Sequence, residues 1–217
     1  MSDGAHTSPH DRLVESLSGG LRPVRRLRAP SLRALAWCAA AMGLGLALLP
    51  FADLDALRIR MAIPDLRYAA LGAVLTALTA ALAAFQTSVP GRSPSWALLP
   101  LGPAALWIGA SGMGCLRDWV APGTERAEAG GCLVFLLAVS MPLSLGLVLM
   151  LRRACPLRPN LTAALAGLSA AAAAAALLVP FHPHDATASD LLLHLVVVGL
   201  VIVANGLAGG RLLARSA

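Results

Sequence analysis

Residues 161–181 read LTAALAGLSAAAAAAALLVPF, a run without a single charged side chain. The hydrocarbon core of a bilayer is about 30 Å thick, so a helix needs about 20 apolar residues to cross it. The rest of the chain has the same character: of its 217 residues, 58% are hydrophobic and 13% are charged, and the mean hydropathy is +0.74. Because an ordinary soluble domain has about 25% charged residues, this composition predicts a polytopic membrane protein.

Five further stretches are long and apolar enough to cross a membrane. The weakest is 96–113, because Pro100 and Pro103 interrupt it, although a bundle tolerates prolines where neighbouring helices satisfy the freed carbonyls. We therefore predict an all-α fold in which residues 32–217 form a bundle of six transmembrane helices and residues 1–31 form a separate tail. The predicted spans are 32–51, 68–87, 96–113, 131–151, 161–181 and 191–210.

The distribution of charge predicts the orientation of this bundle. Arginine supplies all of the basic charge, since the chain has 17 arginines and no lysine. Six crossings place both termini on one side, and the segments on that side hold twelve of the arginines but three of the 11 acidic residues. Because short cytoplasmic loops are enriched in Lys and Arg, we expect both termini to be cytoplasmic.

The spans lack the groups that most transport and redox chemistry requires. Buried ionisable side chains mark most ion and proton pathways, but no span carries an acidic residue or arginine at mid-depth. The sequence has no nucleotide-binding loop and no HExxH metal motif, and the histidine within a span, His194, lies near an end. We expect no catalysis, no cofactor and no direct contact with nucleic acid. A small inner-membrane transporter or metal-efflux accessory protein is the alternative, and it requires a polar pathway through the bundle.

The tail contains the signals of a short amphipathic helix. Ser8 suits the N-cap, Pro9 the first helical position, and Asp11 the first turn, where a carboxylate faces the positive end of the helix dipole. Gly19 and Gly20 weaken the helix that starts at Ser8 and Pro9. Its apolar stripe, at helical spacing, consists of Leu13, Val14, Leu17 and Leu21.

Three interpretations of the tail are open from these residues. The arginines after the stripe suit a lipid anchor, since each basic side chain near anionic lipid contributes about 1 kcal/mol. The helix suits the membrane surface less well, because Asp11 and Glu15 make it less basic than most such helices. It also suits a groove on a cytosolic partner, which its apolar face would fill.

Six short segments carry a resemblance to a known family: DRLVESL at 11–17, LRPVRRL at 21–27, CL at 132–133, SMPL at 140–143, LRRACPLRP at 151–159 and GGRLL at 209–213. In these segments the chain resembles the NrsF family, bacterial inner-membrane anti-sigma factors with six spanning helices. The PVRRL segment is the most specific part. The resemblance covers both ends and the middle of the chain, in order.

The resemblance implies a function for the tail. It implies that the tail holds an extracytoplasmic-function sigma factor inactive at the inner membrane, and that an envelope stress, redox or heavy-metal, releases this partner. The apolar side chains would contact the sigma factor, and the arginines would meet acidic groups of the partner or lipid phosphates. The expected contact residues are Leu13, Val14, Leu17, Leu21, Arg22, Pro23, Val24, Arg25, Arg26 and Leu27.

The resemblance also points to sensor residues at the outer face. In the family, one important cysteine opens the fourth span, which Cys132 matches, and a second follows a histidine after the fifth span. There this chain reads FHPHD, residues 181–185, and lacks the cysteine. Cys115 offers a substitute, since an oxidising periplasm permits a bond to Cys132 if the two Cα atoms come within about 7 Å.

The same face offers groups that suit Zn²⁺ or Cu²⁺, although they also fit solvated loop residues, and no metal site is assigned. The candidate residues, with Cys132, are His182, His184, Asp185 and His194.

Two structural features complete the prediction. The loop 52–67 places Leu54, Leu57 and Met61 at helical spacing, which predicts a short helix on the outer surface. Gly206 and Gly210 form a small-xxx-small face on the sixth span, which predicts close packing against another helix.

Overall fold

The computed structural model describes residues 8–20, 27–120, 129–181 and 188–213, and within these ranges every regular element is helical. Six of the described helical segments are long and apolar enough to cross a membrane, and each overlaps one predicted span. Their helices are α2 (Pro30–Leu48), α4 (Pro64–Thr87), α5 (Leu101–Val120), α6 (Ala129–Arg152), α7 (Pro159–Leu178) and α8 (Ala188–Leu213).

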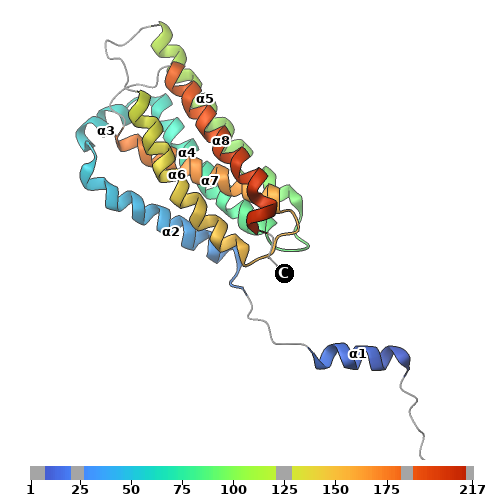
Figure 1. Cartoon of the computed structure of the whole chain (residues 1–217). Coiled ribbons are helices and arrows are strands. Elements are labelled where there is room, and N and C mark those ends of the chain that lie inside the picture. Colours follow the sequence, from blue (N-terminus) through green and yellow to red (C-terminus); the bar gives the residue numbers. More distant parts are fainter. Residues whose placement is uncertain (1–7, 21–26, 121–128, 182–187, 214–217) are drawn as a thin grey trace, which may run out of the picture.

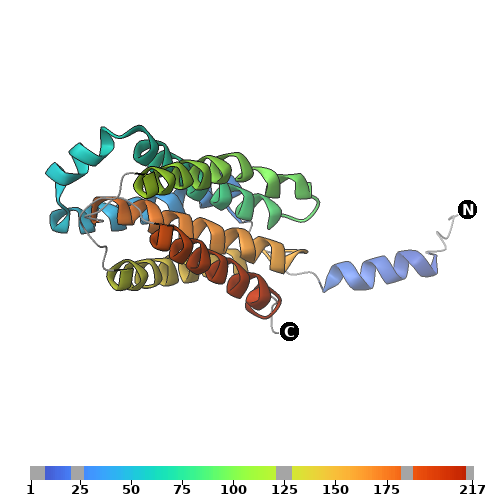
Figure 2. The same ribbon diagram turned by 90° about the horizontal axis from the view of Figure 1, so that it is seen from above.

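The helices run back and forth, so that the bundle has two ends (Figures 1 and 2). We call one the tail end, where α2 begins and α6 and α8 finish. We call the other the α3 end, after the short helix α3 (Leu54–Met61) that connects α2 to α4 there. Helix α1 (Pro9–Gly19) lies outside the bundle and extends away beyond the tail end.

Prolines set where several helices begin. Pro30, Pro64 and Pro159 each occupy the first helical position of α2, α4 and α7, where the missing N–H has no partner to lose. The third predicted span is interrupted at one of its two prolines. Pro100 lies between the 3₁₀ helix η2 (Pro94–Leu98) and α5, whereas Pro103 lies in the first turn of α5 and does not break it.

Helix α7 forms the centre of the bundle and packs on α4, α6 and α8. Its alanine run is the reason: Ala166 and Ala170–Ala175 are buried and present no bulky side chain. Helices without a hydrophobic drive between them associate through such close contacts. At Gly167, an added Cβ would lie 2.9 Å from the carbonyl oxygen of Val201 in α8.

The predicted small-residue face of the sixth span packs against α7. An added Cβ at Gly206 would lie 3.5 Å from the Cβ of Ala164, and one at Gly210 would lie 3.4 Å from the Oδ1 of Asn160. Gly209, which the prediction did not include, makes the closest approach, with 2.7 Å to the carbonyl oxygen of Pro159.

Buried hydroxyls and one amide join the helices. The Oγ of Ser169 donates to the carbonyl of Ala77 at 2.7 Å, linking α7 to α4. The Oγ of Ser144 donates to the Oδ1 of Asn205 at 2.7 Å, linking α6 to α8. Such bonds between helices contribute about 0.6 kcal/mol on average, so they orient helices more than they stabilise them.

The predicted helix in the loop 52–67 is confirmed as α3. Asp53 caps it by accepting from the backbone N–H groups of Asp55 and Ala56, at 3.1 and 2.9 Å. The guanidinium of Arg60 donates to the carbonyl of Val179 at 3.1 Å, which ties α3 to the 3₁₀ helix η3 (Val179–Phe181) after α7.

We expect Gly72→Ala to lower stability. An added Cβ would lie 2.6 Å from the backbone nitrogen of Trp107 and 2.7 Å from its Cα, and overpacking costs about 1–3 kcal/mol. Thermal unfolding of the detergent-solubilised protein, followed by circular dichroism, measures the effect. Gly146→Ala is the matched control, because no atom lies within 4 Å of its added Cβ. Equal melting of the two variants would contradict the close approach of α4 and α5.

Candidate partner-binding tail and sensor end

The N-terminal helix α1 has the start that the sequence predicts. The backbone N–H of Asp11 donates to the Oγ of Ser8 at 3.2 Å, and the backbone N–H of Ser8 donates to the Oδ2 of Asp11 at 3.0 Å. This reciprocal pair is a capping box, which satisfies two of the donors that a helix start leaves open. Pro9 occupies the first helical position. The cap gives this short helix a defined beginning outside the bundle.

The apolar face of α1 is exposed. Leu13, Val14 and Leu17 are 57%, 65% and 65% exposed, and α1 buries none of its residues. Figures 1 and 2 show the helix standing clear of the bundle. Of the predicted contact residues beyond α1, Leu27 is 48% exposed. The others, Leu21, Arg22, Pro23, Val24, Arg25 and Arg26, lie outside the described residues.

Helix α2, which follows the tail, is tied to α6 by two side chains. Arg33, a residue that is 8% exposed, donates from Nη2 of its guanidinium to the carbonyl of Met150. One turn further on, the indole Nε1 of Trp37 donates to the carbonyl of Leu143 at 3.2 Å. Both carbonyls belong to the second half of α6. The first turns of α2 are therefore fixed against the last turns of α6.

The Arg33 contact is favourable for reasons of local chemistry. Met150 lies in the last turn of α6, where a helix leaves its final four carbonyls without an N–H partner and carries partial negative charge. The guanidinium also stacks over the ring of Phe85 in α4, with 4.8 Å from Cζ to the ring centroid. Arg33 thus joins α2, α4 and α6 at the tail end. Sequence reasoning did not identify this role.

The predicted sensor residues gather toward the α3 end as far as they are described. Cys132 lies in the first turn of α6, and its side chain is outside the described part. Cys115 is a free, half-buried thiol on α5. His194 lies in the second turn of α8 and faces a cavity. His182, His184 and Asp185 lie outside the described residues.

The candidate metal cluster and the Cys115–Cys132 bond both stay predictions. Within the described ranges, no three His, Cys, Asp or Glu side chains stand close enough to hold a metal ion. Two other cysteines lie away from the α3 end: Cys38 is half-buried in α2, and Cys155 is exposed in the loop between α6 and α7.

We expect Arg33→Met to destabilise the bundle by about 1.5–3 kcal/mol, the usual contribution of a hydrogen bond to a charged group. Arg28→Met is the matched control, since Arg28 is exposed and surface changes usually stay within about 0.5 kcal/mol. Equilibrium unfolding in mixed micelles measures both. Indistinguishable midpoints for the two variants would show that Arg33 does not hold α2 to α6.

Comparison with protein-family models supplies a match over nearly the whole chain. The model described as NrsF, negative regulator of sigma F, matches residues 17–214. That range includes the end of α1 and all six long helices. Comparison with curated proteins and with solved structures finds no match. The chain belongs to the NrsF family, the negative regulators of sigma F.

Proposed function

We propose that this protein is a transmembrane anti-sigma factor that captures an extracytoplasmic-function sigma factor with its tail, residues 1–31. The family establishes negative regulation of a sigma factor. The observation that carries the rest is α1, a capped helix outside the bundle with Leu13, Val14 and Leu17 exposed on one face. An amphipathic helix with such a face is suited to a hydrophobic groove on a partner.

The proposed location is the bacterial inner membrane, with both termini in the cytoplasm. Six helices of sufficient length and hydropathy support the membrane, and the even number of crossings keeps the tail and the C-terminus on one side. The arginine excess in the segments of that side supports the cytoplasmic assignment. A cytoplasmic tail is also the position from which a sigma factor is accessible.

The contact we propose has an apolar part and a basic part. The leucines and valine of α1 enter the groove on the sigma factor, while Arg22, Arg25 and Arg26 meet acidic groups of the partner or phosphates of the bilayer. Anchors of this kind usually carry most of the binding energy of an interface. The alternative occupant of the apolar face is the membrane surface itself, which the following experiment distinguishes.

We propose further that α6 carries the envelope signal toward the tail. Its first turn holds Cys132 at the α3 end, and its last turns accept from Arg33 and Trp37 of α2. The proposed signal is a redox or metal event at Cys132, Cys115 or the histidines. If this event moves α6, the two bonds transmit the movement to α2, the helix that follows the tail. This is a structural route, and coupling along it requires direct measurement.

We expect Leu17→Asp to reduce retention of the sigma factor by at least about tenfold, because a charge would replace an apolar anchor worth more than 1.4 kcal/mol. The full-length protein is purified from its native host, and the co-purifying sigma factor is quantified by mass spectrometry. Ser16→Asp, which adds the same charge off the apolar stripe, should retain it. A chain lacking residues 1–31 should retain none. Retention by the truncated chain would contradict the proposal.

For the signal, we expect Cys132→Ser or His184→Ala to change the release of the sigma factor under oxidative or heavy-metal stress. The readout is transcription from a promoter that depends on the sigma factor, with and without the stress. Cys155→Ser is the control, because Cys155 lies in the loop at the opposite end of the bundle. Unchanged induction in both Cys132→Ser and His184→Ala would exclude these residues as sensors.

A further inference from the structure

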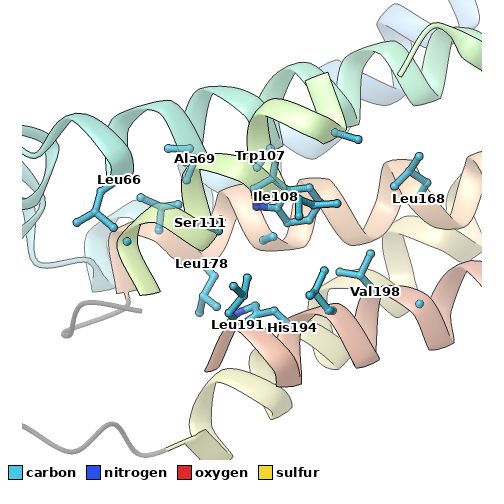
Figure 3. Close-up of a pocket in the computed structure, with 18 of the residues that line it drawn as sticks. Leu66, Ala69, Trp107, Ile108, Ser111, Leu168, Leu178, Leu191, His194 and Val198 are labelled. Atoms are coloured by element: carbon cyan, nitrogen blue, oxygen red, sulfur yellow. The ribbon is translucent and has the colours of Figure 1, made fainter. Parts of the chain in front are cut away.

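A cavity of about 370 Å³ lies among four helices of the bundle and beside α3. In Figure 3, α4 and α5 lie on one side of it, α8 lies on the other, and α7 lies behind. The indole of Trp107 and the imidazole of His194 reach into the space from opposite sides. Ligand pockets usually measure about 300–1,000 Å³ and are mostly apolar with a few polar groups. This cavity falls at the lower end of that range.

The two ends of the cavity differ in chemistry. Its deeper part, toward the middle of the bundle, is lined by apolar side chains, among them Ala73, Ala104, Leu168 and Ile202. Its polar lining residues are Arg60, Ser111 and His194, and they lie toward the α3 end. The cavity is therefore amphipathic along its length. Its charged lining residue is Arg60 at the polar end, where the guanidinium also donates to the backbone carbonyls of Ala56 and Val179.

The cavity also opens on the side of the bundle. Ile108 of α5 and Leu195 of α8 both line it and are 48% and 42% exposed. These two side chains place the opening between α5 and α8. Since both helices are long and apolar enough to cross a membrane, a side opening between them faces hydrocarbon in a bilayer. An apolar molecule can enter there without passing through water.

Glycines on two helices shape the space. Gly72 allows the backbone of Trp107 to approach α4, since an added Cβ would lie 2.6 Å from the Trp107 nitrogen. This contact holds α5 so that the indole lines the cavity. On the opposite side, Gly199 of α8 lines the cavity, and its added Cβ would meet no atom within 4 Å. A side chain at Gly199 therefore has room to occupy the cavity.

We propose that this cavity binds one long-chain fatty acid, with its acyl chain in the apolar part and its carboxylate at the end that holds Arg60, Ser111 and His194. The volume suits a single chain better than a two-chain phospholipid. The polar groups at one end suit a head group that accepts hydrogen bonds and carries negative charge. The site stands independently of sigma-factor capture and adds a lipid ligand to the protein.

Trp107 provides the probe. We would replace Trp96 and Trp119 by Phe and keep Trp37, which is 3% exposed at the tail end and supplies a constant background. The full chain is placed in vesicles of unlabelled phosphatidylcholine, and stearate brominated at mid-chain is added, because bromine quenches tryptophan emission on contact. The expected result is a saturable loss of Trp107 emission that plain stearate reverses. Quenching that grows linearly with brominated stearate, or that plain stearate does not reverse, overturns the proposal.

A matched pair of variants tests the location. Gly199→Leu should raise the half-saturation concentration at least about tenfold, because the added side chain fills the apolar part of the cavity. Gly109→Leu on α5 should leave it unchanged, since Gly109 does not line the cavity and its added Cβ also meets no atom within 4 Å. Unaltered binding by a folded Gly199→Leu chain overturns the assignment.

A second arm separates the fatty acid from a phospholipid chain. Vesicles of phosphatidylcholine brominated on its acyl chains are prepared with the same protein, without free fatty acid. If stearate then restores Trp107 emission, the cavity prefers the single-chain acid, as proposed. Full quenching that stearate does not relieve identifies a phospholipid chain as the occupant and contradicts the proposal. This arm and the stearate titration use the unsubstituted cavity, so they decide the question even if Gly199→Leu does not fold.

Discussion

Close backbone approach around α7 is the constraint on which the rest of the structure depends. Its buried alanines, with Gly167 and the facing Gly209 of α8, let α4, α6 and α8 pack directly on it. Lipid offers helices no hydrophobic drive to associate, so dispersion between closely approaching backbones and a few hydrogen bonds must hold them. The bonds Ser169 to Ala77 and Ser144 to Asn205 fix the rotation of the helices once they are close.

The length and hydropathy of α1 explain why the tail is separate. Helix α1 carries a capping box and an apolar face of three residues, but it has neither the length nor the hydropathy to join the bundle. Its face is left for another surface. Helix α2 then connects this tail to the bundle through Arg33 and Trp37, which bond to carbonyls near the end of α6. The segment proposed to hold a partner and the helix proposed to receive a signal thus meet at α2.

Local signals in the sequence predicted the elements well, because each depends on residues a few positions apart. Ser8, Pro9 and Asp11 predicted the start of α1, and the spacing of Leu54, Leu57 and Met61 predicted α3. Pro103 was misinterpreted as an interruption, since periodicity does not separate the first turn of a helix from a kink, whereas Pro100 does lie at the break between η2 and α5.

The contacts between distant segments were beyond such reasoning. Arg33 and Met150 lie 117 positions apart, and the approach of Gly72 to Trp107 depends on how α5 docks on α4. The cavity is formed by the packing of four helices, so no single sequence motif predicts it. Of the candidate sites, the apolar face of α1 was predictable from its spacing. The identity of the partner came from the family resemblance, which the family match over residues 17–214 supports at the level of a sigma factor.

Site-specific photo-crosslinking from position 17 in living cells tests the central claim most directly. A photoreactive phenylalanine replaces Leu17 in the full-length protein, and the same substitution at Ser16 serves as the comparison off the apolar face. Our account predicts a crosslink to a sigma factor from position 17 that weakens under the inducing stress and is much weaker from position 16. Crosslinks from position 17 to lipid, with no sigma factor captured, would contradict it and identify the tail as a membrane anchor.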